Sequence, residues 1–352
     1  MLGALRTTAV RATPLASAPV KAFECVAPYR VWRDQAMRAG TSVGFVPTMG
    51  ALHAGHLSLV DASLRENDTT VVSIFVNPAQ FAPHEDLSSY PRTLTSDLAQ
   101  LAACEERASA PGRLVALVPQ VRDMYPNGIT QDVARQVGAF VEVAGLSHQM
   151  EGQTRPTFFR GVATVVTKLF NIVQPDRAYF GQKDIQQAIL IRRLADDLLF
   201  RYPHGAAGIR VLPTARDPHD HLALSSRNAY LDSAGRAAAP LLYRSLEAGK
   251  HAWEAGVASG MPSAERVQAT LATARGVMAN GAAALDAQSG EHASVELDYI
   301  SLNDPATLEE LGGAAAGDAA IFSGAMYVRN RSSDKRPAAR LIDNLLLNFS
   351  LS

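Results

Sequence analysis

The segment Gly44-Phe-Val-Pro-Thr-Met-Gly-Ala-Leu-His-Ala-Gly-His56 decides the fold. Its apolar beginning, residues 43–47, predicts a buried strand, and residues 49–52 predict a turn that contains a glycine. His53 and His56 then open a helix. The start of a helix offers unpaired N–H groups and the positive end of the helix dipole, so this junction is suited to bind an anion.

The same alternation of strand and helix continues on both sides of this segment. Further β-branched runs predict strands, and segments with apolar residues at helical spacing predict helices, through the first 210 residues. The other expected strands are 70–76, 114–118, 177–180 and 208–212, and the expected helices are 57–65, 94–107, 161–173 and 185–200. Such alternation indicates an α/β fold whose parallel sheet is covered on both faces. Ligands of these sheets bind at the carboxyl ends of strands, where the candidate residues fall.

The pattern changes after Pro213. Two Ala-rich segments, 234–255 and 263–280, read as helices, whereas 295–302 and 320–328 read as strands with alternating faces. We therefore divide the chain into a leader (1–23), an α/β domain (24–213) and a smaller C-terminal α/β (α+β) domain (214–352). Glycine, alanine, serine and charged residues predict surface loops at 312–317 and 330–336.

Composition excludes several classes of protein. The 352 residues carry 33 Lys and Arg against 34 Asp and Glu, with no basic block, which argues against a nucleic-acid partner. No run approaches the roughly 18 apolar residues of a membrane helix. Two cysteines cannot build a disulfide scaffold, so we expect a reducing, cytoplasmic compartment. Residues 1–23 lack acidic side chains, so they are either a disordered leader or a mitochondrial transit peptide.

The two histidines at the helix start are the first candidate site. His53 and His56 are three residues apart and share one helix face, from which both imidazoles can donate hydrogen bonds to phosphate oxygens. Gly55 between them lets a phosphate approach the backbone closely. The alternatives are a pair of ordinary helix histidines and half of a metal site, although no second Cys or His cluster supports zinc.

Two later segments also place polar groups after strands. Phe180-Gly-Gln-Lys-Asp184 sets Lys183 at a helix start as a point charge for phosphate, unless it is a solvated surface lysine. Leu222-Ala-Leu-Ser-Ser-Arg-Asn228 joins two hydroxyls to a guanidinium that can bind phosphate in a fork, unless it is a helix cap beside an exposed arginine. Gln80 and Gln187 can fix a hydroxy acid, or they are satisfied core amides.

Taken in order, these blocks resemble those of the pantothenate synthetase (pantoate–β-alanine ligase) family. This family lies within the nucleotidyltransferase superfamily that shares a HIGH-type motif with class I aminoacyl-tRNA synthetases. The similarity runs from about residue 25 to 232 and returns at 295–344. It rests on Pro47-Thr-Met-Gly-Ala-Leu-His-Ala-Gly-His56, Ile74-Phe-Val-Asn-Pro-Ala-Gln-Phe81, Tyr90-Pro-Arg-Thr93, Gly181-Gln-Lys-Asp184, Leu224-Ser-Ser-Arg-Asn228 and Arg340-Leu-Ile-Asp-Asn344.

The resemblance implies a two-step ligation in a Rossmann-like nucleotide- and pantoate-binding domain with a smaller C-terminal lid domain. Pantoate attacks ATP to give pantoyl adenylate and pyrophosphate, and β-alanine then displaces AMP to give pantothenate. The resemblance also implies Mg²⁺ with ATP and a homodimer, while composition and charge already argue against a nucleic-acid or a membrane partner.

Roles carry over by motif. The catalytic residues would be His56, His53, Lys183 and Arg227. The ATP-binding residues would be Pro47, Met49, Gly50, Ala51, Leu52, His53, Ala54, Gly55, His56, Gly181, Gln182, Lys183, Asp184, Ala215, Leu224, Ser225, Ser226 and Arg227. Gln80 and Gln187 would bind pantoate. Asp97 and Gln100 match positions linked to the metal in some members, although a neighbouring acidic position is Ser96 here.

This chain departs from the family pattern in three places. Phe158 stands where the family commonly has histidine, the loop at 217–222 has an extra residue and no glycine, and 330–337 looks like an insertion. Three other readings stay open: a nucleotidyltransferase that makes a dinucleotide or lipid-head cofactor, a tRNA synthetase, and an adenylate sensor without turnover.

Overall fold

The computed structural model describes residues 17–83, 85, 87–109, 113–287, 293–312, 317–330 and 338–351. Most of the expected leader, and most of the expected loops at 312–317 and 330–336, lie outside these residues. Lys21–Phe23, which the sequence analysis places in the leader, is instead strand β1 at the edge of the main sheet. Among the described residues, no helix combines the length and the apolar character that crossing a membrane requires.

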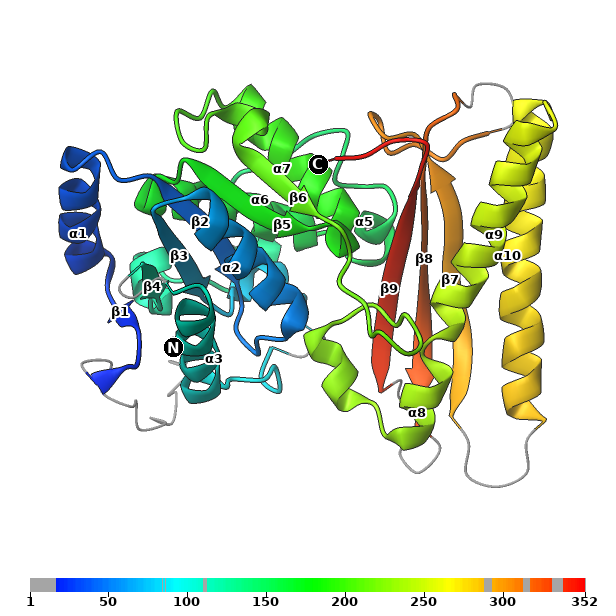
Figure 1. Cartoon of the computed structure of the whole chain (residues 1–352), viewed down its shortest axis with the longest axis horizontal. Coiled ribbons are helices and arrows are strands. Elements are labelled where there is room, and N and C mark those ends of the chain that lie inside the picture. The colour runs from blue at the N-terminus through cyan, green and yellow to red at the C-terminus, as the bar shows by residue number, and fades with distance from the viewer. Residues whose placement is uncertain are drawn as a thin grey trace.

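The N-terminal part is built on one six-stranded sheet in the order β1-β4-β3-β2-β5-β6, with every pairing parallel (Figure 1). After β1 the strands are β2 (Val43–Thr48), β3 (Thr69–Ile74), β4 (Leu114–Leu117), β5 (Arg177–Gly181) and β6 (Ile209–Leu212). β3 and β4 are buried at every position, as expected for parallel strands covered on both faces. This confirms the predicted Rossmann-like parallel sheet.

Helices cover both faces of this sheet. α2 (Ala54–Glu66) and α3 (Leu94–Arg107) pack on one face, and α1 (Val26–Arg38), α6 (Phe158–Val173) and α7 (Ile185–Asp197) pack on the other. Alternate residues of β2 serve the two cores, with Phe45 on the α6 side and Val46 on the α2 side. The short helices α4 (Val121–Met124) and α5 (Glu151–Thr154) lie in the long connection between β4 and α6.

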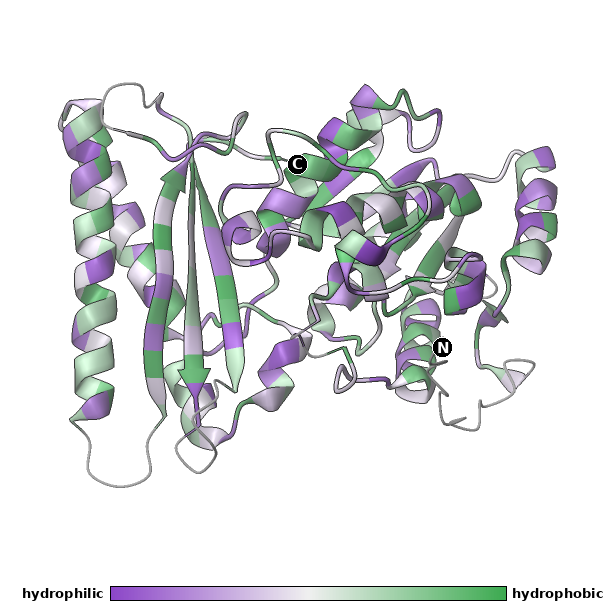
Figure 2. Cartoon of the chain, turned by 180° about the vertical axis from the view of Figure 1, so that it is seen from behind, coloured by the Kyte–Doolittle hydropathy of each residue, from purple (hydrophilic) through white to green (hydrophobic). Residues whose placement is uncertain are grey.

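The C-terminal part is a three-stranded antiparallel sheet with helices on one face. Its strands are β7 (Ser294–Asn303), β8 (Ala320–Arg329) and β9 (Ala339–Leu347), in that order. α9 (Leu241–Ala258) and α10 (Ser263–Asp286) pack against it. Polar and apolar residues alternate along β7, as the sequence analysis expects for a strand with two unlike faces (Figure 2).

The helix predicted at 234–255 is in fact two. α8 (Ser233–Ala238) ends before Pro240, and α9 begins at Leu241. Proline lacks an N–H and clashes with the preceding turn, so it begins a helix but does not continue one.

The two sheets share packing. Leu308, Ile321 and Leu346 of the C-terminal part join the core on the α6 and α7 side of the parallel sheet. The antiparallel sheet therefore stands between the N-terminal part and its own helices α9 and α10, with β9 nearest the N-terminal part (Figure 1). The division into domains near residue 213 stays a prediction.

Candidate active site

A cavity of about 670 Å³ lies at the carboxyl ends of β2, β5 and β6, where the antiparallel sheet meets the parallel one. It is lined by predicted site residues from five separate segments, which the fold brings together. These are Pro47, Met49, His53, Gly55, His56, Gln80, Gly181, Lys183, Asp184, Gln187, Ala215, Leu224, Ser225, Ser226 and Arg227. The lining does not include Gly50, Ala51, Leu52, Ala54, Gln182, Asp97 or Gln100.

The two histidines lie side by side at the start of α2. His53 is the N-cap, and its Nδ1 accepts a hydrogen bond from the Gly55 N–H at 3.1 Å. The ring centroids of His53 and His56 are 4.1 Å apart. A Cβ on residue 55 would lie 2.9 Å from the His53 ring, so glycine allows the ring to rest on the helix start.

Both imidazoles are neutral in this cavity near pH 7. Burial lowers the pKa of His56 to about 3, with further lowering by the charges of His53 and Lys183. Burial and the charge of Lys183 lower the pKa of His53 to about 4. His56 Nδ1 is buried and has no hydrogen-bond partner among the described residues. A neutral imidazole has one N–H group and one acceptor nitrogen. Each ring can therefore donate one hydrogen bond to an incoming anion.

Asp97 holds the turn that leads into α2. Its carboxylate accepts hydrogen bonds from the Leu52 N–H at 2.8 Å and the Ala51 N–H at 3.1 Å. Ala51 has a φ of 50°, in the left-handed region, so this turn depends on contacts that fix it.

Asp97 and Gln100, the residues predicted to lie near a metal, both contact the backbone of this turn. The Asp97 oxygens point to backbone N–H groups, and Gln100 donates to the Leu52 carbonyl at 3.4 Å. The described residues contain no group of three or more His, Cys, Asp or Glu side chains arranged to hold a metal. Sequence matching could not distinguish an aspartate that binds a metal from one that holds the backbone of a turn, because both roles require a carboxylate near the same turn.

Lys183 faces the histidines from the short helix η4 (Gln182–Asp184) after β5. Its Nζ lies 3.7 Å from an oxygen of Asp184. Asn344 of β9 donates from Nδ2 to the carbonyls of Gln182 and Lys183, each at 2.9 Å. The antiparallel sheet thus holds the backbone of the turn that carries Lys183.

The segment after β6 closes the third side of the cavity. Ser226 Oγ donates to the Ala51 carbonyl at 3.1 Å, and Ser225 caps the helix η6 (Ser226–Tyr230) by accepting from the Arg227 N–H at 3.3 Å. Arg216 binds Asp343 of β9 through both guanidinium nitrogens, at 2.6 and 2.8 Å. The segment that carries the Ser225 and Ser226 hydroxyls and Arg227 is therefore attached to the turn after β2 through Ser226, and to β9 through Arg216.

The altered loop at 217–222 has its own anchor. Arg236 of α8 binds Asp220 at 2.5 Å and Asp217 at 2.8 Å. The His221 ring lies 5.3 Å from the ring of Tyr243. The guanidinium of Arg236 therefore links the two carboxylates of this loop to α8.

The two predicted pantoate residues have different surroundings. Gln80 is buried, its Oε1 accepts from Asn77 Nδ2 at 3.0 Å, and its Nε2 contacts Met49 Sδ at 3.1 Å. Gln187 lines the cavity from α7. Its neighbour Gln186 is the core amide of the pair, since it binds the backbone of Leu146, Gln149 and Glu151 instead.

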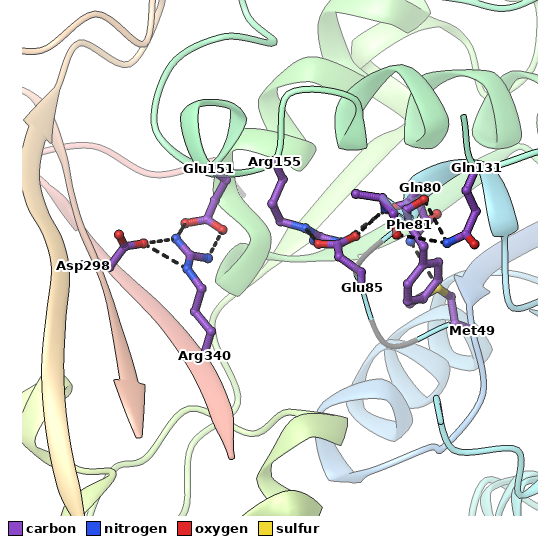
Figure 3. A network of polar contacts seen from close by, with 10 residues as sticks. Met49, Gln80, Phe81, Glu85, Gln131, Glu151, Arg155, Asp298 and Arg340 are labelled. Atoms are coloured by element: carbon purple, nitrogen blue, oxygen red, sulfur yellow. Dashed lines mark hydrogen bonds and ion pairs between the residues drawn. The ribbon is translucent and has the colours of Figure 1, made fainter. Parts of the chain in front are cut away.

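Two charge networks on either side of α5 were not predicted from the sequence (Figure 3). On one side, Arg155 binds Glu85 at 2.5 and 2.9 Å and donates to the Gln80 carbonyl at 3.2 Å. The Arg155 guanidinium also lies 3.9 Å from the centre of the Phe158 ring. Although burial raises the pKa of Glu85, the hydrogen bonds and charge of Arg155 hold it below its ordinary value.

On the other side of α5, Glu151 joins the two parts of the molecule. Arg340 of β9 donates to Glu151 at 2.5 and 3.1 Å, and it also binds Asp298 of β7 at 2.6 and 2.9 Å. The Tyr299 hydroxyl donates to Glu151 at 2.9 Å. Arg340 occurs in a motif of the sequence analysis, but its partners are 42 and 189 residues away, so no local pattern could reveal them.

The chain matches the Pantoate-beta-alanine ligase family over residues 21–346. It is 41% identical to the pantoate–β-alanine ligase of Saccharomyces cerevisiae, over 93% of this chain and 100% of the yeast protein. It is 44% identical to the pantothenate synthetase of Herpetosiphon aurantiacus, over 78% of this chain and 86% of that protein.

Solved structures show the same similarity. The crystal structure of pantothenate synthetase from Thermus thermophilus has a TM-score of 0.68 and 38% identity, covering 93% of this chain and 99% of that one. The pantoate–β-alanine ligase from Francisella tularensis, complexed with beta-gamma ATP and β-alanine, has a TM-score of 0.64 and 27% identity. The match covers 95% of this chain and 100% of that one.

Proposed function

The chain belongs to the pantoate–β-alanine ligase family, and from this premise we propose how its cavity performs the reaction. The protein is a pantoate–β-alanine ligase that makes pantothenate. A carboxylate is a poor acyl donor because its leaving group would be oxide, so the acid must first be activated. We propose that ATP activates pantoate as pantoyl adenylate.

In the first step, an oxygen of the pantoate carboxylate attacks the α-phosphorus of ATP. The bond from this phosphorus to the bridging oxygen breaks, and pyrophosphate leaves. Negative charge accumulates on the phosphate oxygens in the transition state, where fixed donors and cations stabilise it most. His53 and His56 donate from the start of α2, Lys183 approaches from η4, and Ser225 to Arg227 bind from the opposite wall.

In the second step, the neutral amine of β-alanine attacks the acyl carbon of the adenylate. The C–N bond forms, the bond from the acyl carbon to the phosphate oxygen breaks, and AMP leaves while the amine loses a proton. Gln80 and Gln187 hold the pantoyl group through their amides. A cavity of about 670 Å³ has a size typical of small-molecule sites.

One observation supports this proposal most strongly. The His53 and His56 pair, Lys183 and the Ser225–Ser226 hydroxyls line one cavity, although His56 and Lys183 are 127 residues apart in the sequence and Lys183 and Ser225 are 42 apart. Neither an ordinary helix histidine nor a solvated lysine accounts for this convergence. It also favours catalysis over a sensor, since binding alone does not require every one of these groups.

Pyrophosphate exchange tests the proposal directly. The purified protein, given ATP and labelled pyrophosphate, should exchange label into ATP only when pantoate is present. Addition of β-alanine should then yield pantothenate and AMP in equal amounts. Exchange that ignores pantoate but responds to another acid, or tight binding of all three substrates without release of AMP, would contradict the proposal.

Three finer points belong to the same proposal. Mg²⁺ would accompany ATP and neutralise phosphate charge, while Asp97 and Gln100 hold the turn after β2. The protein is a homodimer, which light scattering after size-exclusion chromatography tests. Its location is cytoplasmic, with the mitochondrion as the alternative, which imaging of the full chain and of residues 17–352 tests.

A further inference from the structure

We propose that Asn344 is a positioning residue for Lys183, and that it sets the rate of adenylate formation without contacting a substrate. This inference rests on the proposed function, because it gives Lys183 a role at the triphosphate. Asn344 lies on β9, 161 residues beyond Lys183, in a part of the chain to which we assign no catalytic group.

The amide of Asn344 is matched to the turn that it binds. Its Nδ2 donates to the carbonyls of Gln182 and Lys183, both at 2.9 Å, while its Oδ1 accepts from Gln182 Nε2 at 3.2 Å. Two donors and one acceptor are used together, and Asn344 is only 1% exposed. No carboxylate can replace this arrangement, because a carboxylate offers acceptors where the two carbonyls require donors.

The strand geometry explains why β9 reaches the turn. Successive side chains of a strand point to opposite faces. Leu341 and Leu347 join the core beneath α9 and α10, whereas Leu346 joins the core of the parallel sheet. Asn344, two residues from Leu346, points the same way and meets η4.

The side chain of Lys183 is otherwise weakly held. Within the described residues its ion-pair partner is Asp184, at 3.7 Å from Nζ to the carboxylate, and the Asp184 side chain is 46% exposed. An ion pair at this distance whose carboxylate is nearly half exposed fixes a side chain poorly. The direction of Lys183 therefore depends on its backbone, and Asn344 binds that backbone.

The test compares Asn344→Ala and Asn344→Asp with Asn303→Ala. Asn303 is a matched control, since it is also 1% exposed, lies in the same sheet and donates from Nδ2 to a carbonyl, that of Leu308 at 2.9 Å. Asn344 lines the cavity whereas Asn303 does not, so the Lys183→Ala background described below is needed to separate positioning of Lys183 from a direct contact. Rates of pantoate-dependent pyrophosphate exchange are divided by the concentration of sites that bind ATP, so that loss of folded protein does not count as loss of rate.

Both Asn344 variants should lower the maximal exchange rate roughly 10- to 100-fold, because a misplacement of about 1 Å costs this much. Asn303→Ala should lose stability yet keep the maximal rate per site. If Asn344→Ala does not fold, the isosteric Asn344→Asp still decides. An unchanged rate per site in Asn344→Asp, or an equal loss in Asn303→Ala, would overturn the inference.

A second measurement separates positioning of Lys183 from a general effect. In a Lys183→Ala background, Asn344→Asp should slow exchange less than twofold, because the group that it positions is already absent. Losses that multiply would overturn this inference while leaving the proposed function intact. Failure of the unaltered protein to exchange label in response to pantoate would overturn the proposed function itself.

Discussion

Ser226 donates a hydrogen bond to the carbonyl of Ala51 at 3.1 Å, across 175 residues of sequence. This bond joins the segment after β6 to the turn after β2, the two parts that we propose contact phosphate. Asp97 holds the same turn from behind through the Ala51 and Leu52 N–H groups. The proposed phosphate site is thus held by contacts within the protein, as stabilisation of a transition state requires.

Replacement of His56 by alanine should slow adenylate formation far more than it weakens ATP binding. The hydrogen bond of the imidazole strengthens as charge develops on the phosphate, so its loss should lower kcat about 10²- to 10³-fold with little change in the Kd of ATP. Exchange kinetics and calorimetric ATP titration measure the two quantities. Equal losses in rate and affinity would contradict this role.

The same histidine should make the protein sensitive to acid. Burial lowers the pKa of His56 to about 3 in the folded protein, whereas an unfolded histidine titrates near pH 6.5. Between these values the unfolded state binds the extra proton, so stability falls as the pH falls below about 6.5. At pH 5 the loss from His56 alone should reach about 2 kcal/mol.

Urea unfolding at pH 7 and pH 5 checks this prediction. His56→Asn, which does not titrate, should show a smaller difference between the two pH values than the unaltered protein. His251→Asn, a change at an exposed histidine of α9, should behave like the unaltered protein. An equal difference in His56→Asn and His251→Asn would show that His56 does not carry the effect.

Gln80→Ala should chiefly weaken pantoate binding. Loss of one or two amide hydrogen bonds corresponds to a roughly tenfold rise in the KM for pantoate, with the KM for ATP nearly unchanged. Gln131→Ala is the matched control, because Gln131 donates to the carbonyls of Phe81 and Ala82 in the same loop but does not line the cavity. A pantoate dependence that is the same in both variants would remove Gln80 from the site.

Phe158 should act through Arg155. The guanidinium lies 3.9 Å from the centre of the ring, and such a contact contributes about 1 kcal/mol. Phe158→Leu removes the aromatic face and should raise the KM for pantoate about fivefold, since Arg155 also holds the Gln80 backbone. Phe158→Tyr keeps the aromatic face, so its KM for pantoate should differ little from that of the unaltered protein. Steady-state kinetics that give the two variants the same KM for pantoate would refute a role for the ring through Arg155.

Arg340→Met should destabilise the molecule by about 3–5 kcal/mol, because it leaves Glu151 and Asp298 without their cation in a mostly buried place. Arg329→Met removes a pair on the same sheet whose Glu296 partner is 61% exposed, and should cost about 0–1 kcal/mol. Urea unfolding of the two variants gives the comparison. Similar losses would mean that the network between the two parts contributes no more than a surface pair.

The sequence by itself determined the parallel sheet and the candidate residues for phosphate binding that line the cavity. Apolar runs and helical spacing are local signals, and β2, α2, α3 and β8 begin within a few residues of the predicted positions. The sequence singled out His53, His56, Lys183 and the Ser225–Arg227 segment, all of which line the cavity, because each follows a strand or opens a helix. The order of these motifs was sufficient to predict the family.

The tertiary structure alone decided which residues hold these groups in place. Asn344 at the turn of Lys183, Glu151 with Arg340, and Asp97 at the turn before His53 all pair with residues far away in the sequence. Such pairs cannot be predicted from local periodicity. The sequence pattern of each helix or strand reflects the core that it packs against, and does not reveal its distant polar partner. The strand pairing of Lys21–Phe23 with β4 was missed for the same reason, since three residues are too few for a pattern and only the neighbouring strand makes them a strand.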